Sequence, residues 1–231
     1  MLVPYDLVLS PYLANGSCPF HKIDEPQIQQ STDEQQFLCT ADAQKDADLK
    51  PIVNYITDFL SKPHESLGRS GDVCPFTQKA MNLGAIFFRK YEHPVTSTQE
   101  LSALVSDMGN FFKSKLIADD EYKCVLTVFT NMKSEQYYFI DTVQEIHKVD
   151  FVKEGLMLGQ FHPLCEEAGL WSQAFRPLKS PLPMLAVRHM AKTDIAFLYH
   201  NDDYLSSYKN KFGDSADASI LSFKKRLELS K

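Results

Sequence analysis

The sequence predicts a single α+β domain built around a small, mostly antiparallel sheet that amphipathic helices cover from one side. Short runs rich in β-branched and aromatic residues alternate loosely with longer segments of helical periodicity. About four or five such short runs occur, which is near the usual number of strands in one sheet. The chain has 231 residues, of which 44% are hydrophobic, so it is long and apolar enough to form one packed domain.

The first 47 residues differ from the remainder and predict an N-terminal arm. Prolines interrupt any periodicity here, and residues 27–36 are polar and low in complexity. Apolar residues near the start suggest that part of the arm packs on the body of the protein. We therefore assign residues 1–47 to the arm and residues 48–231 to the α+β domain.

In the first half of the domain, residues 48–62 carry an apolar stripe at helical spacing and predict a helix. Pro75 is suited to the first position of a short helix, which would make Cys74 its N-cap. Residues 85–89 form an apolar, aromatic run and predict a strand. Residues 97–100, Ser-Thr-Gln-Glu, match a capping box, so we expect a long amphipathic helix to begin there.

The second half of the domain follows the same logic. A β-branched run predicts a strand, and an amphipathic segment then predicts a helix. Two further apolar runs predict strands, and two periodic segments close the chain as helices. In order, these expected elements are strand 124–130, helix 137–153, strands 155–161 and 184–190, and helices 202–211 and 216–229.

Composition limits the possible functions. The formal net charge of −6 argues against nucleic acid as the main partner, because phosphate binding needs a basic face. Five widely spaced cysteines favour reduced thiols over a disulfide framework, and the N-terminus lacks the basic region of a signal peptide. No apolar run approaches the roughly 18 residues of a membrane span. We expect a soluble cytoplasmic protein that binds a small molecule and can form a homo-oligomer.

Several side chains have chemical potential, each with a structural alternative. A thiol at the N-cap, as predicted for Cys74, would be activated by the helix N-terminus, although a buried structural cysteine is more common. His162 is predicted to end a strand and to cap a short helix starting at Pro163, where neutral imidazole could bind a metal or accept a proton. Cys165 lies three residues later, a spacing compatible with one metal ion, but no second pair of ligands supports zinc.

The basic residues of the same region could bind an anion. Arg176 and Lys179 flank a proline-rich loop suited to a carboxylate, although solvated surface charge is the more frequent explanation. Arg188 and His189 are expected on opposite faces of a strand, so one of them is structural. Asp194 either pairs with Arg188 or caps the following helix, and we favour the cap.

Four segments carry a resemblance to known families: residues 68–76, 155–163, 176–183 and 188–190. They resemble an uncharacterised bacterial family found near specialised-metabolism genes, over roughly residues 48–212. More distantly, the order of features is similar to the YqcI/YcgG family. Some members of that family are heme-dependent oxygenases that act on amino acids such as arginine. No position here aligns with that family's heme-ligating histidine.

The resemblance implies heme as cofactor and a heme-dependent oxygenase for a small amino-acid-like molecule. On local chemistry, His162 is our choice for the axial ligand, with Cys74 as the second candidate. Arg176 and Arg188 would pair with propionates or a substrate carboxylate. Gln160 would line the pocket if its side chain shares the face of His162.

Two alternatives stay open. One is a cofactor-free enzyme with Cys74 as nucleophile and His162 or His189 as base. The other is a small-molecule-binding protein without catalytic activity.

Overall fold

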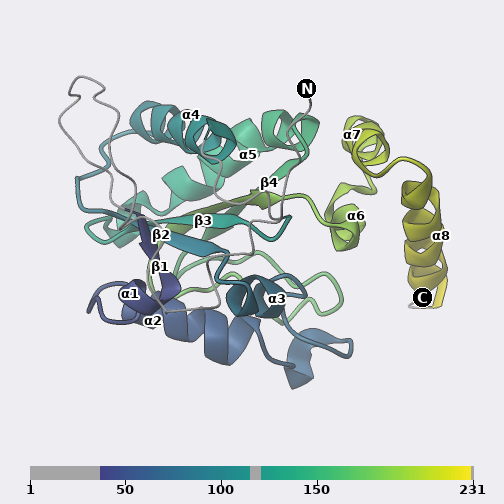
Figure 1. Cartoon of the computed structure of the whole chain (residues 1–231), viewed down its shortest axis with the longest axis horizontal. Helices are drawn as coiled ribbons and strands as arrows, with labels where there is room; N and C mark the ends of the chain where they lie inside the picture. The colour runs from purple at the N-terminus through teal and green to yellow at the C-terminus, as the bar shows by residue number, and fades with distance from the viewer. Residues whose placement is uncertain (1–36, 115–120, 230–231) are drawn as a thin grey trace, which may run out of the picture.

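A computed structural model of the chain describes residues 37–114 and 121–229. These residues form one five-stranded sheet with helices on both faces (Figure 1). The strands are ordered β1-β2-β3-β5-β4 across the sheet. Their bounds are β1 Phe37–Cys39, β2 Ile86–Tyr91, β3 Cys124–Phe129, β4 Leu156–Phe161 and β5 Met184–His189.

The sheet is mixed but mainly antiparallel, as predicted. β2 and β3 are parallel neighbours, and the other three neighbouring pairs are antiparallel. Parallel neighbours require a crossover connection, which the long helix α4 (Thr98–Ser114) supplies. Ser97 caps this helix as predicted, since the Glu100 amide donates to Ser97 Oγ over 3.2 Å, but the return bond of the capping box goes one residue further back. The Glu100 carboxylate then accepts from the Thr96 amide.

The prediction that helices cover one side of the sheet is wrong, because two helical layers enclose it (Figure 1). α4 and α5 (Tyr138–Lys153) pack on one face, and α2 (Lys50–Asn54), η3 (Tyr55–Leu60) and α3 (Thr77–Asn82) pack on the other. All six residues of β3 are buried. A strand that is buried on both faces does not alternate between apolar and polar residues. The sequence of β3 is accordingly almost entirely apolar.

A third group of helices lies beside the sheet (Figure 1). α6 (Ile195–Leu198), α7 (Asp202–Phe212) and α8 (Asp214–Leu229) enclose a separate apolar cluster around the fully buried Tyr208. Short 3-10 turns complete the described structure, at η4 Glu65–Leu67, η5 Ser134–Gln136 and η6 Lys192–Asp194.

The described part of the predicted arm, residues 37–47, joins the sheet. It forms β1, which pairs with β2, and the short helix α1 (Thr40–Ala43). Residues 1–36 lie outside the described residues. Among the helices that the structure describes, none has the length and apolar character needed to cross a membrane.

Candidate metal site

The connection between β4 and β5 covers residues 162–183. Neighbouring antiparallel strands are usually joined by about two to five residues, and loops well beyond about 12–15 residues are commonly functional. Several contacts fix this loop. The Tyr55 hydroxyl of η3 donates to the Pro177 carbonyl, and the His162 amide donates to the Leu178 carbonyl over 3.3 Å. The loop is therefore an ordered structure rather than a loose surface excursion.

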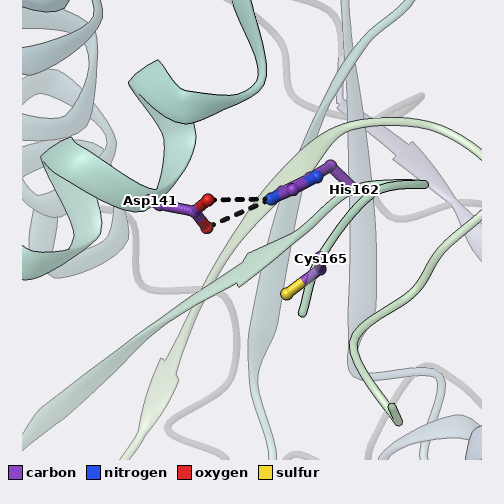
Figure 2. A group of neighbouring side chains, drawn as sticks. All are labelled: Asp141, His162 and Cys165. Carbon is purple, nitrogen blue, oxygen red and sulfur yellow. Dashed lines mark hydrogen bonds and ion pairs between the residues drawn. The ribbon is translucent and has the colours of Figure 1, made fainter. Parts of the chain in front are cut away.

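His162 begins this loop, one residue after β4 ends, as the sequence predicted for the strand end. Its side chain is buried, with 3% of the residue's surface exposed. Nε2 lies 3.0 and 3.1 Å from the two carboxylate oxygens of Asp141, in the first turn of α5 (Figure 2). Helix α5 thus places a carboxylate directly against the imidazole.

Cys165 completes the cluster from the same loop. Its amide donates to the His162 carbonyl over 3.1 Å, which closes a tight turn and brings the thiol back beneath the imidazole. Cys165 is 2% exposed. One ligand atom from each of Asp141, His162 and Cys165 lies within 4.8 Å of the others, and the three side chains converge in Figure 2.

The electrostatic environment of the thiol depends on what occupies the site. Burial raises the pKa of Cys165, and the nearby negative charge of Asp141 raises it further. A hydrogen bond from the Glu167 backbone amide opposes this by favouring the thiolate. A bound cation would reverse the effect of burial, because a coordinating thiol loses its proton outright.

The imidazole is also incompletely satisfied. His162 Nδ1 is buried and has no hydrogen-bond partner in the part of the chain that the structure describes. An unsatisfied buried polar group costs about 1–3 kcal/mol, so such atoms commonly indicate an unseen ligand or a functional role. The ring of Tyr137 packs beside the imidazole, with 5.3 Å between ring centroids.

One nitrogen, one oxygen and one sulfur donor together suit zinc or a similar transition ion. Catalytic zinc sites have three protein ligands and keep a fourth position open, whereas structural sites are closed by four. Three is the number that the described residues supply here. The three donors that the described residues supply match the ligand number of a catalytic zinc site.

Arg188 lies away from this cluster. It alternates with Val187 along β5, so it faces the layer of α2, η3 and α3. Its guanidinium makes two 2.7 Å contacts with the carboxylate of Asp194, which also accepts from the Ala191 amide. Asp194 thus both pairs with Arg188 and caps η6. Burial disfavours the charged guanidinium, but the Asp194 carboxylate more than compensates and raises the pKa of Arg188.

The basic loop residues are paired as well. Arg176 Nε lies 3.1 Å from a carboxylate oxygen of Glu166, and Lys179 Nζ lies 2.6 Å from the other. These two cations hold the pKa of Glu166 below its usual range, with Lys179 contributing first. Arg176 also donates to the carbonyls of Gln173 and Phe175, so it braces the loop internally.

Cys74 does not cap a helix. α3 begins at Thr77, with Phe76 as its N-cap, and Cys74 instead accepts from the Thr77 amide and hydroxyl through its carbonyl. The prediction of an N-cap thiol is wrong because Pro75 and Phe76 form a turn before the helix. Cys74 is half-buried against the apolar cluster below the sheet. The structural interpretation of this cysteine fits its surroundings.

The predicted helix from Pro163 to Ala168 is also absent from the described loop, where a turn and extended chain occur instead. The tight turn from His162 to Cys165 takes its place. Gln160 lies two residues after Leu158 on β4, so both face α5, the side from which Asp141 approaches. Gln160 is half-buried, and its role in lining a pocket with His162 stays a prediction.

Asp141 is the residue of the cluster that sequence reasoning missed. It lies within a predicted amphipathic helix, where an acidic residue ordinarily belongs to the solvated face. Only the packing of α5 beside the end of β4 brings it to His162. The predicted helix 137–153 and strand 155–161 follow one another directly in the chain, so they could have been expected to pack together. That expectation would have indicated acidic residues of the helix as neighbours of His162.

The residues chosen for heme are not gathered at one place. Arg188 is engaged by Asp194, and Arg176 by Glu166. His162 Nε2 faces Asp141, and its ring is enclosed. This arrangement suits a small ion better than a macrocycle, and heme binding stays a prediction.

The fold and the cluster together define an α+β protein with a candidate three-ligand metal site. Residues 49–222 match a family described as a domain of unknown function, DUF6875, and the chain belongs to this family. No curated protein matches the chain, and no solved structure matches it.

Proposed function

We propose that this protein is a metal-dependent enzyme that acts on a small molecule, with a zinc-class ion held by Asp141, His162 and Cys165. The observation that carries the proposal is the convergence of these three side chains within 4.8 Å. Its support is the chemistry of the donors, since imidazole, thiolate and carboxylate are the ligand types that zinc uses.

Two features of the surroundings add support. The buried thiol accepts a backbone hydrogen bond from Glu167, a contact that favours the ligating thiolate form. The ligands come from one helix and one braced loop, which fixes their mutual positions. A zinc ion with three protein ligands leaves a position for water or substrate and lowers the pKa of bound water to about 7, which supports hydrolytic chemistry.

The first test is metal content and cobalt substitution in the full-length protein. We expect one equivalent of zinc per chain by elemental analysis. Replacement by Co²⁺ should give the intense near-ultraviolet band of a cobalt–thiolate bond. Cys165→Ser should remove that band, and His162→Ala should weaken metal affinity by more than about tenfold, since even changes outside the ligand set cost about 10–100-fold.

Cys74→Ser is the matched control, because Cys74 is a half-buried cysteine outside the cluster. This variant should retain both the metal and the cobalt–thiolate band. If wild-type protein binds no transition ion above the level of Cys165→Ser, the metal proposal is wrong.

The heme-dependent oxygenase implied by the resemblance is a second proposal, and one observation favours it. A metal-ligating histidine usually has its other ring nitrogen hydrogen-bonded to a carboxylate, and His162 has Asp141 in that role. The same absorption spectra test this alternative after reconstitution with hemin. A Soret band in wild-type protein that changes in His162→Ala would support heme binding. If wild-type protein shows no Soret band after reconstitution, the heme proposal is wrong.

A further inference from the structure

The two members of the cluster that lie in the loop between β4 and β5, His162 and Cys165, are both tied to one short segment of that loop, residues 176–179. The His162 amide donates to the Leu178 carbonyl of this segment over 3.3 Å. Cys165 is followed directly by Glu166, whose carboxylate contacts the cations at the two ends of the segment. The segment therefore holds the chain on both sides of the turn that joins the two ligand residues.

Both oxygens of the Glu166 carboxylate are engaged. Oε2 lies 3.1 Å from Arg176 Nε, and Oε1 lies 2.6 Å from Lys179 Nζ. The Lys179 amide donates to the Arg176 carbonyl over 3.2 Å, and this turn brings the two cations to one carboxylate. The Arg176 guanidinium is fixed further by the carbonyls of Gln173 and Phe175.

The segment of residues 176–179 is itself anchored to the body of the protein. The Tyr55 hydroxyl of η3 donates to the Pro177 carbonyl, and Tyr55 is buried in the apolar cluster below the sheet. Glu166 therefore links the chain beside Cys165 to a fixed part of the fold.

Cys165 depends on this link more than the other two members of the cluster do. His162 and Asp141 hold each other through the hydrogen bonds between Nε2 and the carboxylate. The Cys165 thiol is instead hydrogen-bonded to the backbone amide of Glu167, two residues further on. Its position is therefore set by the backbone that passes through Glu166.

We infer that Glu166 is a positioning residue of the metal site, which acts through Cys165 by tying the neighbouring backbone to Arg176 and Lys179. This inference rests on the proposed function and goes beyond it by identifying what controls the affinity for the metal. The Glu166 side chain is 69% exposed, and exposed ion pairs contribute little to folding. Metal affinity is more sensitive, because residues outside the ligand set hold the ligands in their mutual positions.

The test is Co²⁺ titration of the full-length protein, followed by the cobalt–thiolate band. Glu166→Gln should lower the Co²⁺ affinity about fivefold, which is within what exposed ion pairs supply. Lys179→Met should lower it about twofold, because the pair with Arg176 is kept. The double variant should match Glu166→Gln, since Lys179 has no pair to lose once the carboxylate is gone.

The direction of the Lys179→Met effect separates positioning from a direct effect of charge on the metal ion. If the charges acted directly, removal of the lysine would strengthen the binding of a cation, whereas loss of the ion pair weakens it. Urea unfolding of the same variants should give wild-type midpoints, because the substituted side chains are on the surface.

Lys113→Met is the matched control. The Lys113 side chain is 45% exposed, against 43% for Lys179, and it pairs with Glu154 at the other end of α5 from Asp141. This control should keep wild-type Co²⁺ affinity. Unchanged affinity in Glu166→Gln, or tighter binding in Lys179→Met, would overturn the inference and leave the metal proposal standing. Failure of the wild-type protein to bind cobalt would remove both.

Discussion

Arg188 keeps its charge inside the protein because Asp194 lies against it. The Asp194 side chain is 3% exposed, and its two oxygens receive both the guanidinium and the Ala191 amide. The ring of Phe76 also lies 4.9 Å from the guanidinium carbon. Such a pair fixes the end of β5 to the start of the α6–α8 group, which gives it a structural role.

This pairing predicts a large loss of stability for Asp194→Asn, about 3–5 kcal/mol in the free energy of unfolding, because a buried guanidinium is left uncompensated. Arg188→Met combined with Asp194→Asn should be less destabilised than the single change, since it removes the unpaired charge. Urea unfolding of the three proteins measures both values. A loss below about 1 kcal/mol for Asp194→Asn would show that the pair contributes little.

At the scale of residues, sequence identified part of the candidate site. His162 was recognisable as a candidate because it follows the strand ending at Phe161. Its spacing from Cys165 is compatible with one metal ion, but the sequence offered no second pair of ligands, so Cys165 was not chosen as a site residue. Asp141 was not, since its position near His162 depends on how α5 packs beside β4. For Asp194 the sequence favoured a helix cap over pairing with Arg188. The structure shows the pair with Arg188 and a bond from the Ala191 amide in η6, whereas the side chain makes no cap bond to the following helix α6.

At the scale of elements, the loop of residues 162–183 is held by a second loop distant in sequence. Gly68 has a φ of +73°, and a Cβ at this position would lie 2.5 Å from the Trp171 carbonyl oxygen. The backbone of one loop therefore rests directly on the other. Arg69 stiffens the loop that contains Gly68 by donating to the carbonyls of Asp72 and Val73. Residues 68–72 therefore have a structural role, which is to support the loop of residues 162–183.

Gly68→Ala should therefore displace the segment around Trp171. Gly71→Ala is its control, because Gly71 also has a positive φ but a Cβ there meets only the end of the Arg69 side chain. Both variants should lose about 1–2 kcal/mol from backbone strain. Only Gly68→Ala should lose more and also shift the emission of Trp171, the single tryptophan of the chain. Identical fluorescence and stability in the two variants would contradict the close contact.

The regular elements were predictable for physical reasons that the loops lack. β3 is apolar along nearly its whole length and β5 begins with four apolar residues, and α4 has both a capping serine and a continuous apolar stripe. The helix expected after Pro163 is absent because His162 is held by residues distant in sequence, its amide by the Leu178 carbonyl and its ring by Asp141, and a tight local turn to Cys165 follows instead. Local propensity does not register such long-range demands.

At the scale of the whole molecule, the sheet extends beyond the segment that defines the family. The family match begins at residue 49, yet β1 lies before it and pairs with β2. The proline-rich character of the preceding residues led to the assignment of 1–47 to an arm, and the short β1 gave no periodicity to oppose it. The contribution of β1 to the stability of the fold comes mainly from one side chain, Phe37.

Phe37 is buried in the apolar cluster beneath α4, with its ring stacked on Phe111 at a centroid distance of 3.9 Å. Phe37→Ala should therefore cost about 3–5 kcal/mol in the free energy of unfolding, the usual loss for a buried phenylalanine. Leu38→Ala is the control on the same strand, since Leu38 faces the opposite side and is only half-buried. Denaturant unfolding should show a clearly smaller loss for Leu38→Ala. Equal, minor losses in both variants would mean that β1 is an attachment to a fold that is complete without it, whereas the predicted difference makes Phe37 part of the core shared by β2, β3 and α4.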